Sequence, residues 1–231
     1  MLNIAGINLT QIALWILNIA LPLIVFYLAY LILTKSFNYI GFTTIEGIII
    51  VLVSFLFSFP IFLFGYNISN IALFTYNGWV VGVNTGGAVI PVLISIYLVI
   101  KKKIPIKQLA IGLLVVTIIT FFVTTPEPTK GIISKFPYWI LPAFFACVAS
   151  IFLLKKNFVK GAPLAYITGT LGVLIGADFL HLPELLSYPP TTLGTRASIG
   201  GAVLFDMIFI TGIIAVLFYG SIMFKYRKTA S

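Results

Sequence analysis

The chain has 231 residues, of which 61% are hydrophobic and only 8% are charged, and its formal net charge is +9. The mean hydropathy of +1.16 is too high for a soluble core of this size, because too few polar side chains remain to cover the apolar ones. This excludes a soluble enzyme, a nucleic-acid-binding module and a disordered chain. The composition predicts a multi-pass protein of the cell membrane, with the lipid bilayer as a partner.

Apolar stretches of the length of a membrane span recur along the chain. A spanning helix needs about 20 mostly apolar residues, and the stretches predict an all-α fold, a seven-transmembrane-helix bundle that forms one domain over residues 1–231. The predicted spans are 11–33, 43–65, 79–100, 106–124, 138–154, 163–181 and 200–223. The outer loops would be 66–78, 125–137 and 182–199, and the last is either a lid over the outer mouth or an ordinary connector.

The basic residues are distributed unevenly between the two sides of this bundle. Only Lys130, Lys135 and Arg196 fall on one side, whereas the loops and tail on the other side contain the rest: Lys35, Lys101, Lys102, Lys103, Lys107, Lys155, Lys156, Lys160, Lys225, Arg227 and Lys228. Cytoplasmic loops are enriched in Lys and Arg, so the N-terminus is predicted outside and the C-terminus inside. The positive charge then reflects topology, and nucleic acid is not a predicted partner.

Two short segments suggest an internal repeat. Residues 86–90 (Gly-Gly-Ala-Val-Ile) resemble residues 200–204 (Gly-Gly-Ala-Val-Leu), and both would begin an inward-running helix. The first and fifth spans also share a Leu-Pro step, at Pro22 and Pro142. A parallel repeat of three helices, a linking helix and three helices would explain both similarities.

Two of the five acidic residues, Asp178 and Asp206, fall inside predicted spans. Each costs at least ~2.5 kcal/mol to bury in lipid, which makes such residues functional candidates. Counting residues from the span ends places both carboxyl groups roughly 5–9 Å below the outer boundary, and Asn84 lies at a similar depth. These three residues are predicted to line one polar pocket, with His181, Glu184 and Arg196 near its rim.

Several chemistries lack the residues that they need. The last two spans contain no Lys for a retinal Schiff base, and one His cannot supply both axial ligands of a haem. No zinc-binding pattern and no phosphate-binding loop occur. The single cysteine, Cys147, is predicted to be a small buried residue. We therefore expect neither a metal nor a cofactor.

Three blocks of the sequence resemble an uncharacterised prokaryotic membrane family, domain of unknown function 1614. They are residues 83–91, 176–180 and 199–212, and the resemblance extends over most of the chain from about residue 70. It implies that Asn84, Asp178 and Asp206 belong to shared motifs of that family. It implies no activity.

The residues leave three functions open. Carboxyl groups and an amide at one depth favour proton- or cation-coupled transport of a small solute. Two carboxyl groups that share a proton favour an intramembrane aspartyl-diad hydrolase, and residues 176–178 and 205–206 are similar to motifs of presenilin-like proteases, in the reverse order. The third function is an accessory membrane protein whose polar residues only position helices. An oligomer is compatible with each of them.

Overall fold

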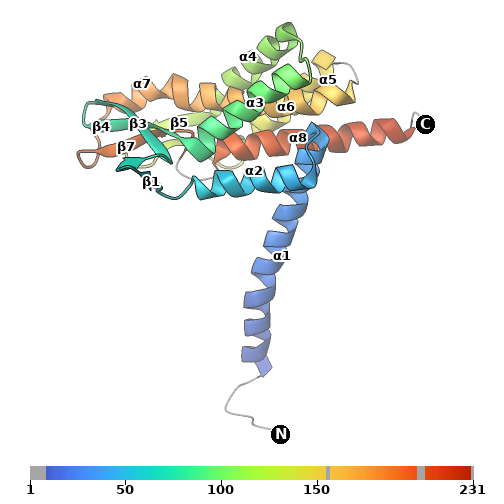
Figure 1. Cartoon of the computed structure of the whole chain (residues 1–231), viewed down its shortest axis with the longest axis horizontal. Coiled ribbons are helices and arrows are strands. Elements are labelled where there is room, and N and C mark those ends of the chain that lie inside the picture. Colours follow the sequence, from blue (N-terminus) through green and yellow to red (C-terminus); the bar gives the residue numbers. More distant parts are fainter. Residues whose placement is uncertain (1–8, 155–156, 202–205, 230–231) are drawn as a thin grey trace.

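The computed structural model describes residues 9–154, 157–201 and 206–229. Lys155, Lys156 and residues 202–205, which include most of the second Gly-Gly-Ala segment, lie outside these ranges. The described chain is mostly helical. Figure 1 shows an elongated body with most helices along its length, strands at one end and helix α1 projecting away from it.

The body is a bundle built around one central helix, α6. It contacts α3, α4, α5 and α8, and all residues from Gly161 to Thr170 are buried. Small residues let the neighbouring helices come close, because a Cβ on Gly172 would lie 2.6 Å from a methyl group of Val116. The helices are α1 (Leu9–Ile40), α2 (Thr44–Leu56), α3 (Ile90–Lys101), α4 (Ile106–Val123), α5 (Leu141–Leu154), α6 (Phe158–Val173), α7 (Leu180–Ser187) and α8 (Met207–Thr229).

Within the described ranges, three helices are long and apolar enough to cross a membrane. They are Ala13–Ile40, Ile106–Val123 and Phe158–Ser187, of which the last joins α6 and α7 through a π-helix, η3 (Leu174–Phe179). The residues of α1 before Thr34 are mostly exposed and apolar, whereas Phe37 and Ile40 are buried in the core. The body therefore holds α1 only by its last turns.

The predicted second and third spans are partly wrong, because strands replace helix on both sides of residue 70. Helix α2 ends at Leu56, shortly before Pro60, which cannot continue a helix. Next come β1 (Phe62–Leu63), β2 (Tyr66–Asn67), β3 (Asn70–Tyr76) and β4 (Trp79–Asn84). An Asn77-Gly78 turn with positive φ at both residues joins β3 to β4, as is common in tight hairpins.

The predicted start of the seventh span is also wrong. Gly200 and Gly201 have φ of +93° and +68°, a left-handed conformation that a helix does not use, and α8 begins at Met207. Before them, β7 (Thr195–Ile199) pairs in parallel with β4, so the strand order is β3-β4-β7. This pairing brings the two Gly-Gly segments of the chain together.

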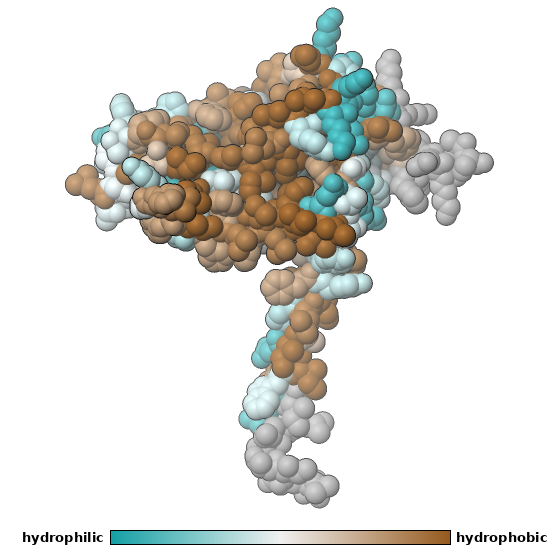
Figure 2. Space-filling view, in the orientation of Figure 1, coloured by the Kyte–Doolittle hydropathy of each residue, from teal (hydrophilic) through white to brown (hydrophobic). Residues whose placement is uncertain are grey.

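A second hairpin lies at the same end of the body. It consists of β5 (Thr124–Glu127) and β6 (Gly131–Ser134), between α4 and a 3₁₀ turn, η2 (Tyr138–Ile140), that leads into α5. Apolar side chains cover much of the body in Figure 2, and hydrophilic ones gather toward the end opposite the strands. At that opposite end, the Lys160 ammonium donates to the Lys103 carbonyl, 2.9 Å away.

Candidate functional site

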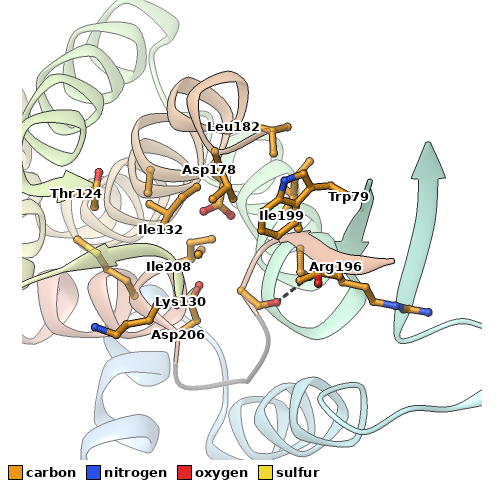
Figure 3. Close-up of a pocket in the computed structure, with 18 of the residues that line it drawn as sticks. Trp79, Thr124, Lys130, Ile132, Asp178, Leu182, Arg196, Ile199, Asp206 and Ile208 are labelled. Carbon is orange, nitrogen blue, oxygen red and sulfur yellow. Dashed lines mark hydrogen bonds between the residues drawn. The ribbon is translucent and has the colours of Figure 1, made fainter. Parts of the chain in front are cut away.

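A cavity of about 450 Å³ lies where the strands meet the helices. Its walls come from β7, from η3 and α7, from the start of α8 and from the β5–β6 hairpin (Figure 3). Apolar side chains of Trp79, Leu182 and Ile199 line it beside the polar groups of Asp178, Ser198 and Asp206. The cavity is thus amphipathic, with two acidic groups in its wall.

Asp178 lies on η3 and is 9% exposed. Its Oδ2 accepts a hydrogen bond from the Gly200 backbone N–H, 2.5 Å away. The π-helix packs very closely on α4, since a Cβ on Gly176 would lie 2.5 Å from the Thr117 carbonyl oxygen. Such π-helical turns are frequent at functional sites, and this one directs a carboxyl group at the loop that follows β7.

Asp206 immediately precedes α8 and does not lie two turns inside a helix as the sequence predicts. Its carboxyl group is close to Gly201, where a Cβ would approach Oδ2 within 2.3 Å. A carboxylate at this position also interacts favourably with the free N–H groups of the helix start. Asp178 and Asp206 nevertheless line the same cavity, and Figure 3 shows both beside it.

No cation forms an ion pair with either aspartate among the residues that the structure describes. Lys130 lines the cavity, but its ammonium pairs with Glu127 at 3.1 Å. Arg196 also lines it, yet its side chain runs away from both aspartates in Figure 3, and Nη1 lies 3.4 Å from the Asn70 carbonyl oxygen. Within the part of the chain that the structure describes, the two acidic groups therefore have no cationic partner.

Asn84 does not line the cavity; it bonds to the Gly200-Gly201 loop, part of which does. Its Oδ1 accepts a hydrogen bond from Gly87 N–H (2.9 Å) at the start of the π-helix η1 (Thr85–Val89), and its Nδ2 donates to the Gly201 carbonyl (3.0 Å). A Cβ on Gly87 would lie 1.9 Å from the Gly200 carbonyl oxygen. Asn84 and Asp178 thus fasten the Gly200-Gly201 loop from opposite sides.

Of the predicted rim residues, only Arg196 lines the cavity. His181 is 5% exposed and stacks on Phe121 with ring centroids 4.5 Å apart. Its Nε2 lies 3.0 Å from the Phe121 carbonyl oxygen, and since a carbonyl only accepts, Nε2 is the donor. Nδ1 faces Glu184 at 3.5 Å. His181 and Glu184 therefore lie next to each other on α7, outside the cavity wall.

Sequence reasoning missed the cavity walls that the strands provide. Trp79 and Ser198 enter the lining from β4 and β7, whose pairing joins distant parts of the chain. The Asn77-Gly78 pair was the available signal for this sheet. Within the described ranges, no three His, Cys, Asp or Glu side chains gather as they would around a metal ion.

Comparison with known proteins identifies the family to which the chain belongs. A model of the family described as "protein of unknown function (DUF1614)" matches residues 59–218. The chain belongs to this family. The match includes both Gly-Gly segments and every residue of the cavity wall, which confirms the resemblance drawn from the sequence. Among curated proteins and among solved structures, no match was found.

Proposed function

We propose that the protein is a multi-pass membrane protein in which Asp178 and Asp206 bind a proton or a small cation during transport of a small solute. The observation that carries the proposal is a single cavity lined by two carboxyl groups that pair with no cation among the described residues. An ionised carboxyl group buried without such a partner is costly, and binding a proton or a cation removes that cost. The cavity has room for a solute beside it.

The proposed topology has seven spans with the N-terminus outside. Its support is the uneven charge: Lys101 ends α3, Lys102 and Lys103 follow it, and Lys160 lies in the first turn of α6, at the end of the body opposite the cavity. This end would be cytoplasmic, and the cavity would open toward the outside. The proposed parallel repeat relates β4 and its Gly-Gly segment to β7 and its own, since each precedes a helix.

Transport is favoured over hydrolysis by the contacts of the aspartates. An aspartyl diad shares one proton between facing oxygens, whereas Asp178 bonds to the Gly200 N–H and no described hydrogen bond joins it to Asp206. Two acidic groups that line one cavity are better suited to binding an occupant than to sharing a proton directly as a diad does.

Infrared spectroscopy of the protein in a lipid film tests the binding step without a known solute. As the pH is raised, the C=O stretch of a protonated carboxyl group disappears, and addition of Na⁺, K⁺ or tetramethylammonium should displace the proton at lower pH. Asp178→Asn and Asp206→Asn should remove this signal, because an amide keeps the shape but cannot ionise. Glu184→Gln is the matched control, since Glu184 lies outside the cavity wall.

Retention of the full infrared signal in both aspartate variants would contradict proton binding at this site.

Proteoliposomes that contain a pH-sensitive dye test the transport step with panels of small amines, amino acids and sugars. A solute that drives proton movement through the wild type and not through Asp178→Asn would support transport. Cleavage of a membrane-embedded peptide without any flux would instead favour the hydrolase.

A further inference from the structure

The strands that precede the cavity have an unusual composition. From residue 47 to residue 100 the chain contains no Asp, Glu, Lys, Arg or His, although this stretch includes the predicted outer loop 66–78. Loops in water are rarely free of charge over such a length. The segment of residues 59–76, named here the aromatic segment, begins where α2 has ended and includes β1, β2 and β3.

The aromatic segment exposes its apolar side chains. Phe64 is 91% exposed, Tyr66 is 77% exposed and Phe62 is 68% exposed. On the edge strand β3, all residues from Ile71 to Tyr76 are exposed, so apolar groups lie on both faces of the strand. In water, an edge strand of this kind would promote aggregation.

Several polar side chains near Ser69 bond to the backbone of the aromatic segment. Ser69 is 4% exposed; its Oγ donates to the Phe59 carbonyl (2.5 Å) and accepts from Ile61 N–H (3.0 Å). Asn67 Oδ1 accepts from Ser69 N–H, 3.0 Å away, and the Thr85 hydroxyl donates to the Ile68 carbonyl. Many backbone groups of the turns are thus satisfied within the protein, as a low-dielectric surrounding requires.

We propose that the aromatic segment inserts into the interfacial region of the lipid bilayer and that lipid, not water, covers its exposed side chains. This proposal rests on the proposed membrane topology. The apolar surface of α2, which includes Ile49, Leu52 and Leu56, leads directly into it, and Figure 2 shows apolar side chains along this side of the body. Phe and Tyr side chains fit the boundary between acyl chains and headgroups.

The unpaired edge of β3 limits how deeply the aromatic segment can lie in the bilayer. Unpaired backbone N–H and C=O groups are not tolerated against hydrocarbon, whereas headgroups and interfacial water can bond to them. The segment therefore lies at the interface and not at the bilayer centre. Because the other side of the same sheet lines the cavity through Trp79 and β7, one wall of the cavity is anchored in lipid.

Spin labels on the full-length protein in lipid nanodiscs test this placement. In a Cys147→Ala background, single cysteines replace Phe64 in the aromatic segment, Leu114 on α4 and Thr129 in the β5–β6 turn; all three positions are exposed. Collisions with oxygen report lipid and collisions with a water-soluble nickel chelate report water. The label at position 64 should lose nickel collisions toward the rate measured at position 114, while position 129 retains them.

Each alternative result has a separate meaning. If position 64 collides with nickel as often as position 129 while position 114 does not, the interfacial placement is wrong and the membrane topology stands. If all three positions collide freely with nickel, the topology itself is wrong. If position 64 meets neither reagent, a protein partner covers the segment and the lipid proposal is overturned. A label at Tyr66 replaces the first variant if Phe64→Cys does not fold.

Discussion

The two hairpin regions at the strand end of the molecule place their polar groups in opposite ways. In the aromatic segment, Ser69 bonds to backbone groups inside the protein and Phe64 faces out. In the β5–β6 hairpin, Glu127 and Lys130 form an exposed ion pair across the turn. Under the proposed insertion of the aromatic segment, similar secondary structure serves two surroundings, and the side on which polar groups lie distinguishes lipid from water.

The largest expected difference is between Gly87, which lies beyond the aromatic segment where η1 contacts the Gly200-Gly201 loop, and Gly131 in the β5–β6 turn. Gly87→Ala would push a methyl group against the Gly200 backbone oxygen, which cannot move without its loop, and should cost about 3 kcal/mol of unfolding free energy. Gly131→Ala in the β5–β6 turn meets no neighbour within 4 Å and carries only the cost of positive φ, about 1–2 kcal/mol. Thermal unfolding in detergent micelles measures both. Equal losses would contradict the tight attachment at Gly87.

A smaller difference is expected for two serines that bond to the backbone. Ser69→Ala removes a buried hydroxyl and leaves the Ile61 N–H without its acceptor and the Phe59 carbonyl without its donor, and it should cost about 2 kcal/mol. Ser134→Ala removes a bond to the Val123 carbonyl (2.7 Å) from a half-buried side chain, where water can replace it, and should cost less than about 1 kcal/mol. Denaturant titration of the matched pair checks the order. A larger loss for Ser134→Ala would reverse the assignment of the two surroundings.

The smallest effect is expected at the ion pair of the β5–β6 hairpin. The Lys130 and Glu127 side chains are 67% and 34% exposed, so water and salt screen their attraction. Lys130→Met should change the unfolding free energy by no more than about 0.5 kcal/mol. Unfolding curves recorded at low and high salt should coincide for this variant and the wild type. A strong salt dependence of the wild type alone would mean that the ion pair contributes more to stability than expected.

The accuracy of the sequence prediction varied along the chain for physical reasons. The fourth span was predicted at 106–124 and α4 covers Ile106–Val123, because a largely apolar run without Pro begins at Leu109 and continues to Val123. The run from Trp79 to Val83 is equally apolar but rich in β-branched residues, so composition alone did not separate strand from span. This segment forms β4, and its parallel partner β7 lies more than a hundred residues further along the sequence. A local sequence pattern cannot predict pairing over such a separation.

The sequence pointed to the two acidic residues of the candidate site, but not to the backbone structure that positions them. The cost of burying a charge singled out Asp178 and Asp206, and both line one cavity. Because Gly200 and Gly201 are left-handed, α8 begins later than the predicted span does. Asp206 therefore lies just before the first residue of α8 and not inside the helix. Asn84 was selected for its depth, yet it bonds to the loop and lies outside the cavity wall.

The hydrogen bond between Asp178 and Gly200 makes the loop and the cavity compete for one oxygen atom. A cation that attracts Asp178 Oδ2 weakens its bond to the Gly200 N–H, and a proton on that oxygen makes it a poorer acceptor. By reciprocity, any force that pulls the loop away leaves the carboxylate freer to take up an occupant. Under the proposed function, binding of an occupant in the cavity is thus coupled to the strength of the hydrogen bond that holds Gly200.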